Sequence, residues 1–430
     1  MSASLTTPIP THESSTKDHK TLKLYAIFVW FLGAFFFFSE YALRVSPGVM
    51  YPDLIDKYSV SAAALGMLSS MFYYPYIIMQ IPVGIITDKF GPRKVMVLAS
   101  FLTGLACLIF LFANSFNLAI ISRAIMGFCA AFAFVGTLRI AINWFSPTQF
   151  SMLAGLTQAA GMLGASFGSA PLGFYLSHVG ISGVMLSFAA LFLLLALLMG
   201  VLLKKLPRQP VTLPLSSQQD SPFKRIFTNK QLWINCFYIS MLYGPTVVLA
   251  ESWGISFTEA FRSLSEKDAS MLVSLIFIGL LIGCPIMGVA ARVVTQRFLM
   301  RICAVFCLIF ALLIIYKNNL SLITLCACYF LYGLFNSGII AAYARSASLV
   351  TKEVSGLALS ITNIFSILLG AIFVQIVGAY LSAQNTTDNA IFDVGAYQHI
   401  FTLLIVSFAI CIFLALLMSK NTISRRPASV

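Results

Sequence analysis

Residues 84–94 read Gly-Ile-Ile-Thr-Asp-Lys-Phe-Gly-Pro-Arg-Lys, a short polar segment at the end of a long apolar run. Gly91 and Pro92 favour a tight turn between two helices. Gly84 predicts that two helices approach each other closely. Asp88 stands where the apolar run ends, and we expect it to accept hydrogen bonds from the N-terminus of a neighbouring helix. The segment therefore predicts a structured loop between two membrane spans.

The same segment is basic, which indicates the side of the membrane on which it lies. Its cationic residues are Lys89, Arg93 and Lys94. Short cytosolic loops are rich in lysine and arginine, so these residues predict a cytosolic loop. A mere basic turn needs neither glycine nor an acid, and we therefore expect Gly84, Asp88 and Gly91 to act with the three cations in conformational gating.

Composition places the whole chain in a membrane. Of its 430 residues, 59% are hydrophobic and only 10% are charged, and the mean hydropathy is +0.92. Soluble domains carry about 25% charged residues. The net charge of +13 comes from short basic clusters between apolar runs, so no nucleic-acid partner is expected. All nine cysteines lie inside apolar runs, which predicts neither a disulfide framework nor a metal site.

Apolar runs long enough to cross a bilayer as helices recur along the chain. The expected spans are residues 22–47, 61–87, 95–114, 118–142, 151–177, 183–203, 231–258, 269–291, 298–316, 320–344, 355–381 and 397–419. The expected fold class is an all-α membrane protein of twelve helices.

The loop pattern adds a resemblance to a known family. Residues 84–94 fit G-x-x-x-D-[KR]-x-G-x-[RK]-[RK], which resembles the signature loop between the second and third spans of the major facilitator superfamily. The resemblance implies a solute carrier made of two pseudo-symmetric six-helix bundles, and not an enzyme.

A polar, proline-containing stretch divides the chain where such bundles would meet. We expect a disordered cytosolic tail (1–21), a first bundle (22–203), a flexible cytosolic linker (204–230), a second bundle (231–419) and a cytosolic tail (420–430). The two bundles look like repeats. Gly84 with Arg93 is echoed by Gly288 with Arg297, and Gly127 pairs with Gly333 of the tenth span.

The distribution of basic residues predicts the orientation. Outside loops hold Lys57, Arg262, Lys267 and Lys317, and Arg44 and Arg123 lie within spans. The remaining 21 of the 27 basic residues lie in cytosolic segments if the N-terminus is inside. This bias predicts that both termini are cytosolic, and we expect a multi-pass protein of a bacterial inner membrane.

Charges of opposite sign lie one helical turn apart in the first span. Glu40 and Arg44 share a helix face. The surrounding residues resemble the first span of the organic-anion symporters of the superfamily, which implies that Arg44 binds a substrate carboxylate. The acid usual before that arginine is replaced by Leu43, so Glu40 is expected to serve in proton coupling. The alternative is an internal Glu40–Arg44 ion pair.

A second buried arginine lies in the fourth span. Arg123 and Gly127 resemble the superfamily's R-x-x-x-G element, which implies a role for Arg123 in substrate binding or proton coupling. The symporters add an acid about two turns later, where this chain has Ala130 and Ala131. The alternative role for Arg123 is a structural partner for backbone carbonyls or for Glu40.

The seventh span carries an acid, Glu251, after Gly244-Pro245, which is expected to break or kink the helix. Glu251 is expected to bind an amine or to exchange protons, and the alternative is a residue in water at the outer end. This region also resembles bacterial relatives of lysosomal dipeptide transporters. Among neutral residues, we expect Tyr74, Gln158 and Asn363 to bind substrate, with helix–helix hydrogen bonding as the alternative.

The expected function is secondary transport by alternating access. Nothing in the sequence resembles an ATP-binding motif, so we expect a gradient to drive transport, and we expect that gradient to be one of protons. The favoured substrate is a small organic acid, amino acid or short peptide taken up by a monomer without a cofactor. The alternative is efflux of drugs or a metabolite, favoured by the Phe35–Phe38 run. A sensor or scaffold is disfavoured because the cytosolic segments are short.

Overall fold

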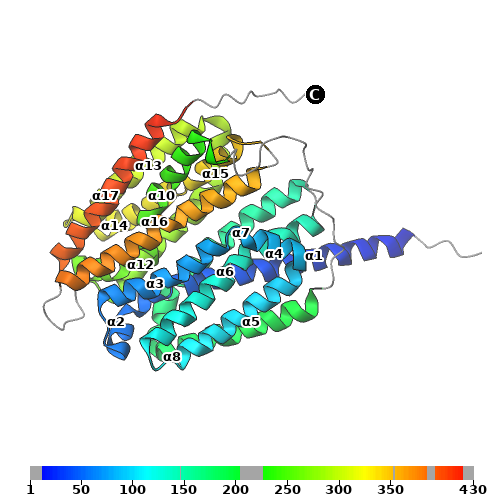
Figure 1. Ribbon diagram of the computed structural model, residues 1–430, viewed down its shortest axis with the longest axis horizontal. Helices are drawn as coiled ribbons and strands as arrows, with labels where there is room; N and C mark the ends of the chain where they lie inside the picture. The colour runs from blue at the N-terminus through cyan, green and yellow to red at the C-terminus, as the bar shows by residue number, and fades with distance from the viewer. Residues whose placement is uncertain (1–11, 146, 204–225, 352–353, 385–392, 420–430) are drawn as a thin grey trace, which may run out of the picture.

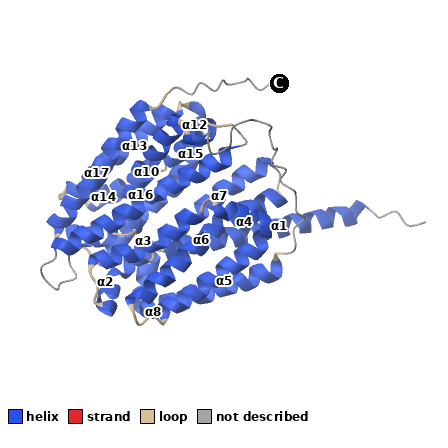
Figure 2. Ribbon diagram, in the orientation of Figure 1, coloured by secondary structure: helices blue, strands red, loops and turns tan. Residues whose placement is uncertain are grey.

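The computed structural model describes residues 12–145, 147–203, 226–351, 354–384 and 393–419, and its regular elements are all helices (Figure 2). The first half contains α1 (His12–Val45), α2 (Pro47–Tyr58), α3 (Ala62–Met79), α4 (Pro82–Phe90), α5 (Pro92–Leu111), α6 (Phe116–Trp144), α7 (Pro147–Phe167) and α8 (Ala170–Leu202). The second half contains α10 (Lys230–Glu251), α11 (Gly254–Arg262), α12 (Glu266–Val293), α13 (Gln296–Tyr316), α14 (Leu322–Asn336), α15 (Ile339–Ser348), α16 (Ser355–Gln384) and α17 (Val394–Leu417).

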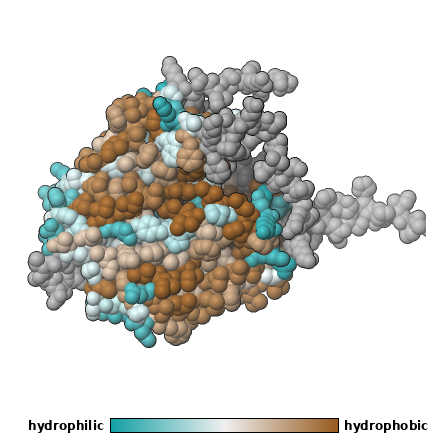
Figure 3. Space-filling view, viewed as in Figure 1, coloured by the Kyte–Doolittle hydropathy of each residue, from teal (hydrophilic) through white to brown (hydrophobic). Residues whose placement is uncertain are grey.

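Within the described residues, eleven helical segments are long and apolar enough to cross a membrane, with α14 and α15 together counted as one. Helix α7 has 21 residues and takes the fifth position between α1 and α12, which brings the spans to twelve. Hydrophobic side chains form broad bands over the helices, and the most hydrophilic surface lies toward the two ends of the bundle (Figure 3). The predicted fold class is confirmed.

The two halves lie side by side along one seam (Figure 1). Helices α3 and α16 pack along its centre, and α7 and α8 pack against α12. At one end, Tyr25 of α1 donates a hydrogen bond to the carbonyl of Leu202, and Gln231 accepts one from the Ser419 amide. We call this the linker end, and the end formed by α2 and α11 the opposite end.

The same close contact between two helices occurs within each half. A Cβ on Gly127 of α6 would lie 1.9 Å from the Phe72 carbonyl oxygen of α3, and one on Gly333 of α14 would lie 2.0 Å from the Ile276 carbonyl oxygen of α12. Both glycines therefore allow two helix backbones to touch. The predicted pairing of Gly127 with Gly333 corresponds to the same contact in each half.

The short helices at the opposite end also repeat. Ser59 caps the C-terminal end of α2 and Ser263 that of α11, and both serines adopt left-handed backbone with φ of 50°. Two residues later, the hydroxyls of Ser61 and Ser265 accept hydrogen bonds from the first turns of α3 and α12. A serine side chain in this position satisfies a backbone donor at the helix start, so the same local signal ends and begins helices in both halves.

Several expected boundaries differ from the structure. Helix α1 begins at His12, so residues 12–21 are helical rather than a disordered tail, and residues 1–11 lie outside the described residues. The second span divides at Gln80–Ile81, and the fifth ends at Phe167. Helix α10 continues through Pro245 and breaks at Ser252 instead. The linker residues 204–225 and the tail 420–430 also lie outside the described residues.

The halves are packed tightly at the opposite end. A Cβ on Gly378 of α16 would lie 2.5 Å from the Ala62 carbonyl oxygen, and the Ala63 amide donates to the Ser382 hydroxyl at 2.7 Å. Toward the linker end, added Cβ atoms on Gly84, Gly155, Gly288 and Gly356 would meet no atom within 4 Å. The two halves are therefore in close contact at the opposite end.

We predict that Gly127→Ala and Gly333→Ala each destabilise the protein by about 1–3 kcal/mol, because the new methyl group must displace a backbone carbonyl. Thermal unfolding of the purified protein in nanodiscs measures the effect. Gly155→Ala is the control, because its methyl group enters open space. Unchanged unfolding temperatures for both Gly127→Ala and Gly333→Ala would contradict the described packing.

Candidate functional site

A buried ion pair lies near the end of α1. Arg44 Nε and Nη2 donate to Glu40 Oε1 at 3.0 and 2.7 Å, and both side chains are about 1% exposed. The pair forms because residues four apart share one helix face. Glu40 Oε2 is buried and has no hydrogen-bond partner among the described residues. The structure thus contains the ion pair that the sequence allowed, with one carboxylate oxygen unused.

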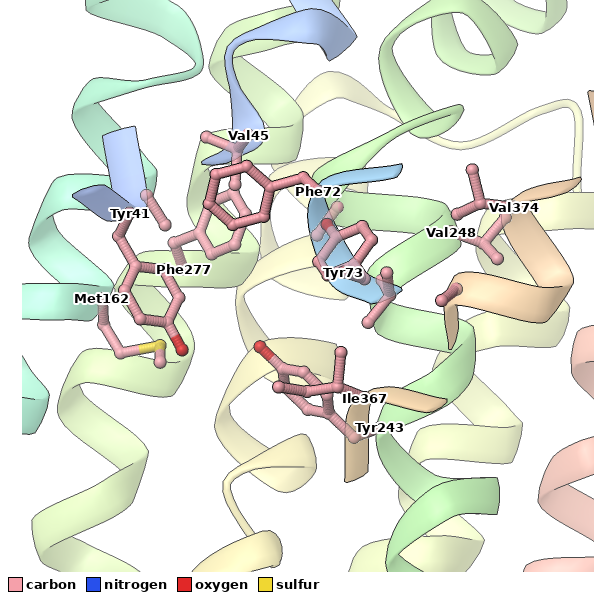
Figure 4. Packing of buried hydrophobic residues seen from close by; sticks show 14 of the residues in the cluster. Tyr41, Val45, Phe72, Tyr73, Met162, Tyr243, Val248, Phe277, Ile367 and Val374 are labelled. Atoms are coloured by element: carbon pink, nitrogen blue, oxygen red, sulfur yellow. The ribbon is translucent and has the colours of Figure 1, made fainter. Parts of the chain in front are cut away.

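Aromatic rings surround the Arg44 guanidinium. Its carbon lies 4.1 Å from the ring centroid of Tyr41, 4.5 Å from that of Tyr76 and 5.5 Å from that of Phe72. Figure 4 shows Tyr41 of α1 beside Phe72 of α3 in the packed interior. A cation is attracted to the face of an aromatic ring, most strongly away from water. The rings therefore help to hold a charge that the membrane interior does not solvate.

Arg123 belongs to α6, and its side chain binds the C-terminal end of α1. Its Nη1 and Nη2 donate to the carbonyls of Leu43 and Arg44 at 3.0 and 3.1 Å. The last carbonyls of a helix have no partner within the helix, so a cation there satisfies them and interacts with the helix dipole. The guanidinium also lies 4.6 Å from the Phe72 ring, and Nε has no partner among the described residues.

Glu251 brings a carboxylate from the other half to the same region. Its Oε2 accepts a hydrogen bond from the Tyr73 hydroxyl at 2.6 Å, and its Oε1 accepts one from the Tyr243 hydroxyl at 2.9 Å. Glu251 is only 2% exposed, so it does not lie in water at the outer end. Among the described residues, no basic nitrogen lies within 4.0 Å of its carboxylate. Its described hydrogen bonds therefore come from two neutral hydroxyls.

The neutral residues expected to bind substrate lie apart from these charges. Tyr74 donates to Gln375 Oε1 at 2.8 Å, and Asn363 Nδ2 donates to Gln80 Oε1 at 2.8 Å. Both bonds join α3 to α16 across the seam. Gln158 is half-buried on α7, and no described hydrogen bond joins it to the charged residues. The binding roles of the three residues stay predictions.

The signature loop, residues 84–94, is held in place by contacts with other helices of the first half. Asp88 forms an ion pair with Arg139 of α6, rather than accepting from a helix N-terminus as expected. Arg93 donates to the Gly200 carbonyl of α8. Gly91 turns the chain with φ of 83°. The expected close approach at Gly84 is not seen, because a Cβ there would meet nothing within 4 Å. Lys89 lies beside the Phe90 ring and Lys94 is exposed.

Sequence reasoning chose Tyr74 from three nearby tyrosines and missed the more informative ones. Tyr73 contacts Glu251, and Tyr76 contacts Arg44. Helical spacing could have identified both tyrosines, because residues 73, 76 and 80 lie on one face of a helix and residue 74 is rotated away from that face.

We predict that Arg44→Met destabilises the protein by about 3 kcal/mol more than the double variant Glu40→Gln/Arg44→Met, because the single change leaves a buried carboxylate without its cation. Chemical or thermal unfolding of the four proteins of the cycle in nanodiscs measures the difference. Equal stability of the single and double variants would show that Glu40 gains its stability from groups other than Arg44.

Comparisons with known proteins agree with this architecture. A family model described as "Major Facilitator Superfamily" matches residues 29–261, more than half of the chain. A bacterial homologue of the human lysosomal transporter Spinster, solved in an inward-facing and unoccupied conformation, superposes with a TM-score of 0.76 at 15% identity, covering 92% of this chain and 97% of that one. A mutant of the nucleoside transporter NupG superposes with a TM-score of 0.69 at 16% identity, covering 91% and 100%.

Sequence relatives are named as anion carriers. A probable sulfoacetate transporter, SauU, of Cupriavidus necator is 23% identical over 61% of this chain and 64% of its own length. Probable anion transporter 7 of Oryza sativa subsp. japonica is 26% identical over 60% of this chain and 64% of its own. The matching stretch thus spans less than two thirds of these relatives. With twelve spans in two repeated halves and a family match over residues 29–261, this chain belongs to the Major Facilitator Superfamily of membrane transporters.

Proposed function

We propose that this transporter takes up a small organic anion and that Arg44 binds the acid group of the substrate. The observation that carries the proposal is a guanidinium buried beside the seam, with two of its five N–H groups used by Glu40. The remaining donors suit a carboxylate or sulfonate, which arginine binds in a bidentate manner. The names of the anion-carrying relatives support the same chemistry.

Arg123 adds a second positive charge to the site. Its described donors engage the α1 carbonyls, so we assign it mainly to positioning Arg44 and to making the region attractive to an anion. Direct contact of Arg123 with substrate would use its unpartnered Nε after a local rearrangement.

Glu251 suggests a second chemical group that the substrate could carry. A buried carboxylate that belongs to no described ion pair favours a ligand with a positive or hydrogen-bond-donating group. A substrate that carries an acid at one end and an amine at the other, such as an amino acid or short peptide, would complement Arg44 and Glu251 together.

Proton coupling follows from the ion pair. While Glu40 is ionised, it competes with an anion for Arg44. A proton placed on its unpartnered Oε2 would neutralise Glu40 and release the charge of Arg44 for substrate. Proton entry would then favour anion binding, as symport requires. Glu251 is the second carboxylate that a proton could occupy.

Uptake also depends on orientation. The excess of basic residues near the linker end supports a cytosolic linker end and cytosolic termini. The structure would then be closed toward the outside, and alternating access would follow from rocking of the halves about the seam. A monomer in a bacterial inner membrane is consistent with this arrangement.

Efflux of an apolar compound is the second candidate. Phe31, Phe35 and Phe38 stack along one face of α1, and Phe38 also contacts Phe167 of α7. An aromatic surface of this kind suits an apolar substrate better than a small anion.

We predict that externally added anion acidifies the lumen of proteoliposomes that contain the protein and a trapped pH dye. Arg44→Ala should slow this uptake at least about tenfold, because a hydrogen bond to a charged group is worth roughly 1.5–3 kcal/mol. Lys317→Ala is the matched control, because it removes an exposed cation far from the site.

The panel of solutes contains organic acids, sulfonates, amino acids, dipeptides and cationic drugs. No response to any acid, with proton release from acid-loaded vesicles when a cationic drug is added, would favour efflux and leave Arg44 a structural charge.

A further inference from the structure

The bond between Tyr73 and Glu251 differs from the other contacts across the seam. Tyr73 belongs to α3 of the first half and Glu251 to α10 of the second, and their hydrogen bond measures 2.6 Å. This length falls in the range of about 2.5–2.7 Å that is typical of a hydroxyl donating to a carboxylate. Tyr243 makes the second bond to the same carboxylate from within the second half.

The other described hydrogen bonds between the halves use neutral groups. They are the bonds Ala63–Ser382, Ser70–Ala371, Tyr74–Gln375, Ser166–Ser274, Ser169–Ser270, Ala170–Ser274 and Gln80–Asn363. Their strength does not depend on protonation. Among these contacts, Tyr73–Glu251 is the one whose acceptor can change its charge.

The Tyr73–Glu251 bond lies close to the contacts between the halves at the opposite end. Glu251 ends α10, and two residues later Trp253 begins the turn into α11. The Trp253 indole donates to the Val374 carbonyl of α16, and its ring lies 4.8 Å from that of Tyr51 on α2. A change at Glu251 therefore acts directly beside the contacts that close the opposite end.

We propose that Tyr73 couples the charge of Glu251 to the closure of the two halves at the opposite end. This inference rests on the proposed proton-coupled transport and names the residue that links the proton to the movement. When Glu251 is ionised, Tyr73 donates to a carboxylate, and the bond holds the seam shut. When Glu251 is protonated, the bond joins two neutral groups and is about half as strong, so the opposite end opens more readily.

The neighbourhood of Glu251 contains other ionisable groups. From α1, Glu40, Tyr41 and Arg44 lie close enough to interact with it electrostatically. From α3 and α10 the facing groups are Tyr73 and Tyr243. The ionisable side chain of α16 is Tyr380, which lies near the C-terminal end of that helix. Of these groups, Tyr73 is the one that joins Glu251 to the first half by a hydrogen bond.

The proposal is tested by a distance across the opposite end, measured at several pH values in nanodiscs. Spin labels placed by Asp56→Cys on α2 and Lys267→Cys on α12 occupy exposed positions in different halves. Protein without these two cysteines reports any labelling of the native cysteines, which are buried or half-buried. We expect the distance to lengthen as the pH falls, and Glu251→Gln to give the long distance at every pH.

Three tyrosine variants separate coupling through Tyr73 from the simple loss of a hydrogen bond. Tyr73→Phe should abolish the dependence of the distance on pH. Tyr74→Phe removes a neighbouring phenol whose acceptor is neutral, and Tyr243→Phe removes a phenol bonded to Glu251 from within the same half. Both should keep the dependence on pH. A pH response of Tyr73→Phe equal to that of the unchanged protein would overturn the proposal.

Transport separates failure of this inference from failure of the proposed function. In Tyr73→Phe, uptake driven by a pH gradient should fall at least about tenfold, while exchange of labelled for unlabelled anion at equal pH persists. If the unchanged protein moves no anion under either condition, the proposed function fails. If it does and Tyr73→Phe retains full gradient-driven uptake, only the coupling role of Tyr73 fails.

Discussion

A charge inside a membrane protein must be stabilised by the protein itself, because no bulk water reaches it. Arg44 shows how this constraint organises the structure. Glu40 supplies the opposite charge from one turn earlier, and rings from α1 and α3 cover the guanidinium. Each of these groups belongs to a helix that packs at or near the seam. Side chains of α1 and α3 therefore meet around one buried arginine.

The charges are divided unequally between two halves that share one architecture. Gly127 and Gly333 make matching helix contacts, and Ser59 and Ser263 end matching short helices. The first half buries Arg44, Glu40 and Arg123, whereas the second buries Glu251 and, on α15, Arg345. A repeated scaffold thus carries different buried charges in its two halves. In the proposed function, the first half supplies Arg44 for an anion and the second supplies Glu251 for a proton.

The sequence predicted the features that depend on local spacing. The twelve spans, the turn at Gly91 and the Glu40–Arg44 pair all follow from runs and intervals within one segment. The sequence could not predict contacts between distant segments, such as the bond from Tyr73 to a carboxylate 178 residues away. It also misplaced the break near Pro245, because a proline within a buried helix is tolerated when neighbouring helices support it. Gly84 was expected to allow close packing, but a Cβ there would meet no atom within 4 Å.

The proposed function depends most on where the anion binds. The direct measurement is a structure of the protein in nanodiscs with a small carboxylate or sulfonate identified by transport. We predict that the acid group lies within hydrogen-bond distance of the Arg44 guanidinium, between α1 and the aromatic rings of α3. Density for the anion at another site, with the Arg44–Glu40 pair undisturbed, would contradict it.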